Sequence, residues 1–186
     1  KRLQKLLPKI TPDIVSVEYN PQTVINLNAL EQAKQTPEGT QKLANYWCKK
    51  WNYNLETVRQ FIPILDYEYF VAREYCRQHH KSIIFSDLGD IDLGQRGFHY
   101  TMSTPLPITQ QQIEIAYQSE IIPVPPEEVT NLMKRDAYTE TILRALQGKV
   151  VHIVGAWHLF GNYYNLYERI RDLNPTRIML KEADSL

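Results

Sequence analysis

Three side chains that can bind a cation or move a proton each follow a short apolar stretch of the sequence. Glu18 comes after residues 14–17, Asp87 after residues 82–86, and His158 shortly after residues 150–154. If these stretches are parallel strands, their carboxyl ends meet at one edge of a sheet and the three side chains converge there. Two carboxylates and an imidazole suit Mn²⁺, Zn²⁺, Co²⁺ or Fe²⁺. The alternative is that strand ends carry acids only because they meet water, and the sequence leaves both interpretations open.

The third of these stretches ends in a glycine turn. Val150 to Val154 is rich in β-branched residues and too short to span a membrane, which predicts a buried strand of an α/β sheet. Gly155 ends the strand and lets the backbone turn sharply or approach a ligand closely. His158 lies at the carboxyl end, where open α/β sheets bind ligands, whereas His152 inside the strand is expected to be a hydrogen-bonded core residue. A structural role for His158 stays open, because a histidine without a known partner is ambiguous.

A polar cluster interrupts the buried face predicted for the helix over residues 127–147. With helical periodicity, Arg135, Asp136 and Thr139 fall on or beside an apolar stripe of Val129, Leu132, Leu143 and Leu146. Buried charges are costly unless they are paired or bound to a ligand. Arg135 therefore either forms a structural salt bridge, with Asp136 or with a strand residue, or anchors a carboxylate of the substrate or of Glu18.

The elements that would position these residues alternate between strands and helices. Strands are predicted at 14–17, 82–86, 150–154 and 177–181, and helices at 3–10, 64–80, 127–147 and 163–173. This alternation predicts a single α/β domain over 1–186, with a largely parallel central sheet covered by helices on both faces. Residues 22–62 are expected to form a helical insert with a break at 36–39, and residues 90–126 a loop or cap region suited to cover a substrate.

Composition argues against several classes of function. The 186 residues carry a formal net charge of zero, which argues against a general nucleic-acid or membrane-surface binder, although a small basic patch stays open. Cys48 and Cys76 do not form a close pair such as Cys-x-x-Cys, so metal binding through sulfur is not expected. The sequence contains no apolar run as long as a membrane span, no Gly-rich phosphate loop, no Gly-x-Ser-x-Gly and no His-Glu-x-x-His.

The chain begins at Lys1, with neither a methionine nor the apolar region of a signal peptide. We therefore expect it to be a piece of a longer product, in which a signal, an anchor or a first strand would precede Lys1. For the piece as given, a cytoplasmic location is favoured, and no pattern in the sequence encodes an oligomeric state.

A set of short motifs occurs in a fixed order along the chain. It comprises Pro12 to Glu18, a helix with Glu68 and Ala72 leading to Ser86 and Asp87, Lys134 to Asp136, and Val154 to His158. In this order the motifs resemble the TraB/PrgY/GumN family, which is similar to the Tiki metalloproteases and, more remotely, to the erythromycin-esterase and ChaN-like proteins. The resemblance spans most of the chain and is closest between Arg135 and Glu182.

The resemblance implies an erythromycin-esterase/ChaN-like α/β fold. In this family two Gly-x-x-His motifs and a glutamate at a strand end are thought to assemble a metal-dependent peptidase site. Here Gly155 to His158 matches the second histidine motif, and Glu18 matches the glutamate. Arg135 matches an arginine on the helix before the last motif, and Asp87 matches an aspartate at a strand end.

The chain also departs from the family in three ways. The first Gly-x-x-His motif would lie upstream of the helix at 3–10, which this chain does not include. No arginine follows Glu18, and Leu88 follows Asp87 where an arginine is expected. These departures leave open whether the chain holds only half of its site or has kept binding without catalysis.

Together these observations predict a metal-dependent hydrolase of peptide bonds. Glu18 and His158 would bind a divalent ion (Mn²⁺, Co²⁺ or Zn²⁺), and Asp87 or Glu18 would act as the general base. Arg135 and Trp157 would contact the peptide or small-molecule substrate, and Arg135 would stabilise developing negative charge. Two alternatives stay open: a non-catalytic protein that binds a peptide signal or a small ligand such as haem, and a metal-free esterase with histidine as its base.

Overall fold

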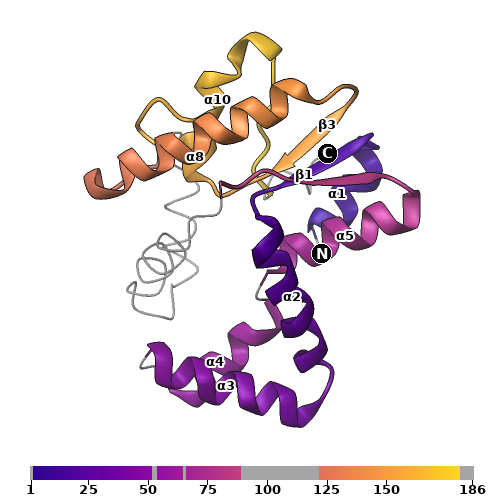
Figure 1. The fold of residues 1–186 in the computed structure, drawn as a ribbon, viewed down its shortest axis with the longest axis vertical. Helices are drawn as coiled ribbons and strands as arrows, with labels where there is room; N and C mark the ends of the chain where they lie inside the picture. Colours follow the sequence, from indigo (N-terminus) through magenta and orange to yellow (C-terminus); the bar gives the residue numbers. More distant parts are fainter. Residues whose placement is uncertain (1, 52–53, 65, 89–121, 181–186) are drawn as a thin grey trace. The chain divides into compact units, whose positions relative to one another are not determined.

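A computed structural model describes residues 2–51, 54–64, 66–88 and 122–180. The chain divides into two compact units, one made of Lys1–Asn20, Glu68–Leu88 and Ala116–Leu186 and the other of Pro21–Tyr67 and Gly89–Ile115. The first unit contains all the strands of the described residues (Figure 1). The second unit is helical over the residues described in it.

The first unit is built on a three-stranded parallel sheet. β1 (Ile14–Val17) lies between β2 (Ser82–Phe85) and β3 (Val150–Ile153), and it pairs with both neighbours along its whole length. Val15 and Val17 of β1 are fully buried, as expected for a strand with neighbours on either side. The mixed α/β class with parallel strands is therefore confirmed, and these strands lie where the sequence pattern placed them.

The predicted strand over 177–181 is wrong for its described part. Residues 174–179 have no regular secondary structure. The Arg177 guanidinium donates to the carbonyl oxygen of Leu159 at 2.9 Å and lies 4.7 Å above the Phe160 ring. These contacts hold the segment by its side chains, and such tertiary contacts override a local preference for strand.

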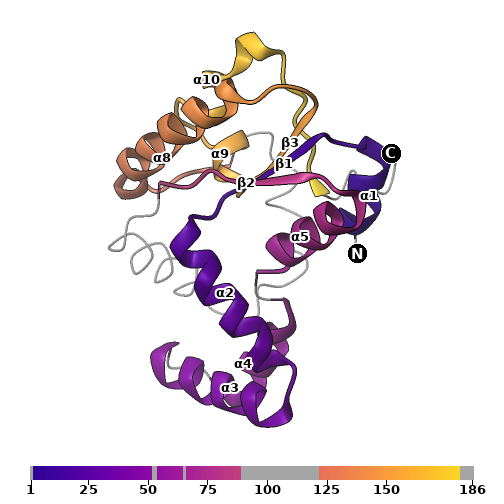
Figure 2. The same ribbon diagram turned by 45° about the vertical axis from the view of Figure 1, so that its right-hand side comes forward.

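Several helices accompany the sheet. They are α1 (Arg2–Ile10), α5 (Tyr67–His79), α8 (Pro126–Ala145), α9 (Trp157–Phe160), α10 (Leu166–Arg169) and the 3₁₀ turn η2 (Arg171–Leu173). α8 and α10 pack against each other, and Figures 1 and 2 show them together on one side of the strands. The helix predicted over 163–173 is shorter than expected. Asn165 caps α10 by accepting a hydrogen bond from the Glu168 N–H at 3.2 Å, and η2 replaces the last part of the predicted helix.

α8 is the element that carries polar residues toward the sheet. It begins with Pro126 at its first position, where the missing N–H of proline has no cost. Its buried residues are Leu132, Asp136, Thr139 and Leu143, so the predicted polar interruption of an apolar stripe is confirmed. Leu143 packs against Leu166 and Ile170, which fixes α8 against α10 and the residue that follows it.

The second unit contains α2 (Pro21–Lys34), α3 (Pro37–Trp51), α4 (Leu55–Phe61) and the 3₁₀ turn η1 (Ile62–Ile64). They occupy the region of the expected helical insert. The break between α2 and α3 covers residues 35–36 and overlaps the predicted 36–39 only at Thr36, because α3 already begins at Pro37. Thr36 Oγ1 accepts from the Gly39 N–H at 3.0 Å and so caps α3. The core of this unit contains Ala44, Val58 and Ile62, with Leu43, Trp47, Cys48 and Leu55 packed against them.

The expected cap region is described only at its end. Residues 90–121 of that region lie outside the described residues, and Ile122 forms an isolated parallel bridge with Gly161 shortly before α8 begins. Throughout the part of the chain that the structure describes, no helix has both the length and the apolar character needed to cross a membrane.

Candidate active site at the edge of the sheet

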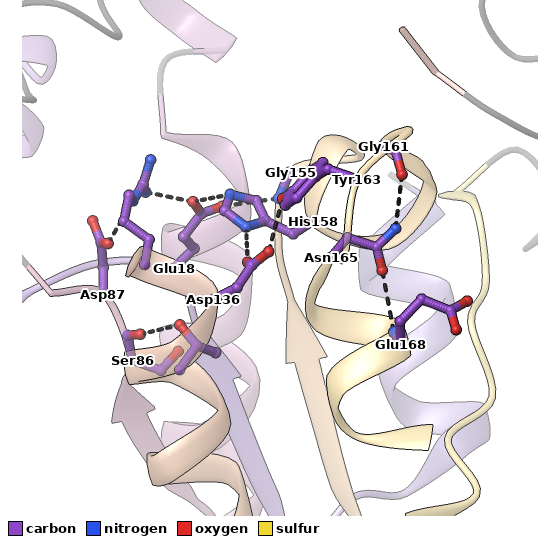
Figure 3. Close-up of polar contacts among 12 residues, drawn as sticks. Glu18, Ser86, Asp87, Asp136, Gly155, His158, Gly161, Tyr163, Asn165 and Glu168 are labelled. Atoms are coloured by element: carbon purple, nitrogen blue, oxygen red, sulfur yellow. Dashed lines mark hydrogen bonds and ion pairs between the residues drawn. The ribbon is translucent and has the colours of Figure 1, made fainter. Parts of the chain in front are cut away.

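The four side chains predicted to form a site come together where the strands end, and Figure 3 labels Glu18, Asp87 and His158 among them. Arg135 reaches from α8, donates to Asp87 Oδ1 at 2.8 Å and pairs with Glu18 Oε1. His158 Nε2 lies 2.8 Å from the same Glu18 oxygen. The Glu18 carboxylate is thus held between a guanidinium group and an imidazole ring.

The parallel strands explain why these residues converge. The N–H of Glu18 donates to the Ile153 carbonyl at 3.2 Å, and the N–H of Asp87 donates to the Tyr19 carbonyl at 3.2 Å, so pairing continues past the ends of the strands. The N–H of Gly155 donates to Glu18 Oε2 at 2.9 Å. A β-carbon at position 155 would lie 3.4 Å from that oxygen, which is an ordinary van der Waals contact, so the hydrogen bond does not by itself require glycine.

His158 lies in the first turn of α9 and is only 5% exposed. Its Nδ1 bonds Oδ1 of Asp136, a fully buried carboxylate on α8. The hydroxyl of Tyr163 donates to the other oxygen of this carboxylate, Oδ2, at 2.7 Å. The imidazole therefore has a carboxylate on each side, Asp136 at Nδ1 and Glu18 at Nε2, and these two partners fix the orientation of the ring.

Opposite charges at short range decide the ionisation of the two central groups. Burial favours a higher pKa for Glu18, but His158 and Arg135 outweigh it and lower the pKa to about 2. Burial favours a lower pKa for His158, but Glu18 and Asp136 outweigh it and raise the pKa to about 9. Without a bound cation, Glu18 and His158 are therefore an ion pair at neutral pH.

Carboxyl groups outnumber the cationic groups in this cluster. Glu18, Asp87 and Asp136 face Arg135 and the imidazolium of His158. A divalent cation in place of the His158 proton would correct this imbalance, whereas a second anion would increase it. The electrostatics of the cluster thus favour a positively charged ligand.

The partner of Asp136 was not predicted from the sequence. Its position on a buried stripe did signal that this acid needs a partner, but the partner considered was Arg135. Arg135 pairs instead with Glu18 and Asp87, which is the predicted strand-to-helix salt bridge, and Asp136 pairs with His158. Tyr163 belongs to no motif, and no sequence signal identified it as a donor to Asp136.

Two other residues considered in the sequence have defined positions. His152 is hydrogen-bonded, as expected for a core histidine, with Nδ1 at 3.1 Å from Ser16 Oγ. Trp157 is the first residue of α9 and is half-buried beside His158 in the chain. Its contact with a substrate stays a prediction.

The donor set fits a divalent cation in part. Glu18 Oε1 and His158 Nε2 face each other, and the other nitrogen of His158 is held by a carboxylate, as is usual for a metal-binding histidine. Within the described ranges, no three His, Cys, Asp or Glu side chains are grouped to hold an ion. Two ligands are fewer than a bound cation needs. The others would have to come from water, from the substrate or from parts of the protein that the structure does not describe.

A surface cavity of about 560 Å³ adjoins the cluster. It is lined by Phe160, Gly161, Asn162, Tyr163, Asn165, Glu168 and Arg177. Its volume is within the range of small-ligand sites. Tyr163 belongs to both features, because it lines the cavity and its hydroxyl bonds Asp136 (Figure 3).

No protein-family model, curated protein or solved structure matches this chain. The case for a function therefore rests on the chemistry of the cluster itself.

Proposed function

We propose that this protein is a metal-dependent hydrolase of peptide bonds, with Glu18 and His158 as two ligands of a divalent ion such as Mn²⁺, Co²⁺ or Zn²⁺. The observation that carries the proposal is the buried Asp136 carboxylate at Nδ1 of His158, opposite the nitrogen that faces Glu18. Metal-binding histidines usually donate their second ring N–H to a carboxylate or carbonyl in this way. The ion would supply Lewis acidity at the scissile carbonyl.

The other residues of the cluster position and balance these two ligands. Asp136 keeps a proton on Nδ1 of His158, which directs Nε2 toward Glu18. Arg135 fixes the Glu18 carboxylate and, as a cation, stabilises negative charge that develops on a substrate carbonyl. Asp87 is our candidate for the general base. Its Oδ1 is bonded to Arg135, which leaves Oδ2 for a proton, whereas both oxygens of Glu18 already accept hydrogen bonds.

The cavity beside Tyr163 is where we place the peptide. Glu168 and Arg177 at its lining offer a carboxylate and a guanidinium to the polar groups of a peptide backbone or terminus. Arg135 and Trp157 would contact the substrate closer to the scissile bond.

Membership of the TraB/PrgY/GumN family is part of the same proposal, as is a sheet covered by helices on both faces. The order of the motifs around Glu18, Asp87, Arg135 and His158 supports the family. The placement of α8 and α5 on opposite sides of the strands in Figures 1 and 2 supports the fold.

A metal-free hydrolase is a second candidate, and one observation favours it. His158 Nε2 and Glu18 Oε1 are 2.8 Å apart, which is a hydrogen-bond distance, so a proton alone satisfies the pair. Such an enzyme would cleave its substrate equally well in the presence of a chelator. A non-catalytic binding protein would bind a peptide or a small ligand such as haem and cleave neither.

Elemental analysis of the purified protein tests the proposal most directly. We expect near-stoichiometric divalent metal in the wild type, and its loss in His158→Ala and Glu18→Gln. His79→Ala is the matched control, because it removes an exposed histidine at the end of α5 whose ring lies against Tyr75 and not in the cluster. Equal metal content in all four proteins would contradict the proposal. A folded wild type that binds no added Mn²⁺, Co²⁺ or Zn²⁺ would also contradict it, and chelator-resistant cleavage or binding without cleavage would then separate the alternatives.

A further inference from the structure

His152 lies in β3 and takes no part in the proposed site. It pairs in register with Ser16 of β1, and its Nδ1 lies 3.1 Å from Ser16 Oγ. The hydroxyl groups of Ser16 and Ser86 each have only one hydrogen to donate, and this determines which atom is the donor between Ser16 Oγ and His152 Nδ1. The Ser86 hydroxyl donates to the Val17 carbonyl at 3.1 Å, so the Ser16 hydroxyl has to donate to Ser86 Oγ, at 2.9 Å. Ser16 Oγ is then an acceptor, and His152 Nδ1 is the donor.

The direction of these hydrogen bonds fixes the tautomer of His152. With its hydrogen on Nδ1, a neutral imidazole carries a lone pair on Nε2. Burial, the largest influence, lowers the pKa of His152 to about 4, so the ring is neutral at physiological pH. His152 Nε2 is therefore a hydrogen-bond acceptor.

This acceptor is enclosed although the residue as a whole is only half-buried. Nε2 is shielded from solvent, and no described residue donates a hydrogen bond to it. Buried polar atoms in folded proteins almost always have a partner, which is either a protein group or an ordered water. His152 Nε2 is therefore a buried acceptor for which the described residues provide no donor.

The acceptor lies on the face of the sheet that carries the proposed site. Ser16 and Glu18 are two residues apart in an extended segment and share a face, and His152 stands opposite Ser16 on the neighbouring strand. The nearest donors of the site are directed at other groups: Arg135 donates to two carboxylates and Tyr163 to Asp136, and neither donates to His152. A charged donor from outside would lose its hydration on entering an enclosed position.

We propose that His152 Nε2 binds a single enclosed water molecule on the face of the sheet that carries Glu18. Water is the smallest neutral donor, and its remaining hydrogen and oxygen can bond polar groups of the same face. This inference does not depend on the proposed hydrolysis, because it rests on the direction of the serine hydrogen bonds and on the enclosed position of His152 Nε2.

A crystal structure at a resolution that shows ordered waters tests the inference. We expect a water at about 2.7–3.2 Å from His152 Nε2 in the wild type. His152→Gln should retain it, because the amide oxygen can replace Nε2 as acceptor. His152→Asn should lose it, because its amide keeps only a donor near the position of Nδ1. A wild type with no water there, or with a protein donor in its place, would overturn the proposal.

Histidine ¹⁵N NMR of the same chain provides an independent readout. We expect His152 to be protonated on Nδ1 and unprotonated on Nε2 at pH 7, and the reverse tautomer would overturn the proposal. On addition of Zn²⁺, the His158 resonances should shift while the Nε2 resonance of His152 does not, and a zinc-bound Nε2 would rule out water as its ligand. Absence of any zinc effect would contradict the proposed metal site but not the water at His152, so the two proposals fail separately.

Discussion

At His158, two carboxylates share one imidazole, and they differ in how firmly they are held. Asp136 is 0% exposed and its second oxygen is bonded by Tyr163. The Glu18 side chain is 18% exposed and lies at the end of a strand. Asp136 is therefore the fixed partner, and Glu18 is the partner that a ligand can replace or join. Exchange of a proton for a cation is expected on the Nε2 side of the ring.

The role of Asp136 predicts a measurable loss of cation affinity in Asp136→Asn. Removing the charge from a carboxylate behind a metal-binding histidine typically weakens metal binding by about 10–100-fold. Isothermal titration with Zn²⁺ measures the change. Asp172→Asn is the control, because Asp172 is an exposed carboxylate paired with Arg144, and its affinity should equal that of the wild type. Equal affinities in all three proteins would contradict a supporting role for Asp136.

The charge states of Glu18 and His158 predict how stability depends on pH in the metal-free protein. The pKa of His158 is raised from 6.5 to about 9, so its stabilising contribution is complete below pH 6.5 and is lost as pH rises through 9. The pKa of Glu18 is lowered from 4.5 to about 2, so its contribution is complete above pH 4.5 and is lost as pH falls toward 2.

We therefore expect the contribution of this pair to the free energy of unfolding to be largest between pH 4.5 and 6.5. Urea unfolding at a series of pH values measures it, with the double variant Glu18→Gln, His158→Asn as the baseline. The difference between wild type and variant should decrease from pH 6.5 to 9. A constant difference over that range would contradict the ion pair.

At the level of elements, the local sequence pattern predicted where the strands and helices lie more accurately than how long they are. β1, β2 and β3 are short and rich in β-branched residues, and their apolar runs located them within a residue. The run at 177–181 is also apolar but contains only one β-branched residue, Ile178, and in its described part Arg177 contacts Leu159 and Phe160 instead of a strand. Those contacts join residues distant in sequence, so no local pattern contains them.

In the site, too, local patterns predicted some residues, whereas contacts between distant parts of the chain could not be predicted. Glu18, Asp87 and His158 were predicted together because parallel strands bring their ends to one edge. The predicted buried stripe of α8 also placed Asp136 inward, but which group it meets depends on the turn after β3. Tyr163 reaches Asp136 only because α9 and the residues after it fold back toward α8, and a single sequence does not encode that path in a recognisable motif.

Thr139 links α8 to the end of β2, and its replacement tests how much this link contributes. Its hydroxyl donates to the Ser86 carbonyl at 2.6 Å in a buried position. Thr139→Val keeps the shape but leaves that carbonyl without this donor, which should lower the free energy of unfolding by about 1–3 kcal/mol. Thr141→Val is the matched control on the same helix, because the exposed Thr141 hydroxyl donates only to its own helix at Ala137. Denaturant unfolding of both variants measures the change in the free energy of unfolding. Equal decreases in the two variants would show that the hydrogen bond from Thr139 to Ser86 contributes no more than the one within the helix.

At the level of the whole molecule, the net charge of the chain differs from the charge of the polar cluster. The chain as a whole has a formal net charge of zero, yet its polar cluster holds more carboxyl than cationic groups. Long-range attraction of a cation is therefore weak, and under the proposed function any selectivity for a cation would have to come from the cluster. The consequence is that cation binding should depend little on surface charges far from α8 and the sheet.

A cation that binds the folded cluster should also slow the opening of the sheet. At 100 times its dissociation constant, a ligand specific to the folded state adds about 2.7 kcal/mol, which corresponds to about a hundredfold more protection from hydrogen exchange. We expect Zn²⁺ to give this protection to the amides of β1 in the wild type and none in His158→Ala. The amides of α3 report on the second unit, and equal protection there would show that both units open together. Since only binding to the folded cluster produces protection that depends on His158, an unchanged exchange rate in β1 at saturating Zn²⁺ would contradict the site.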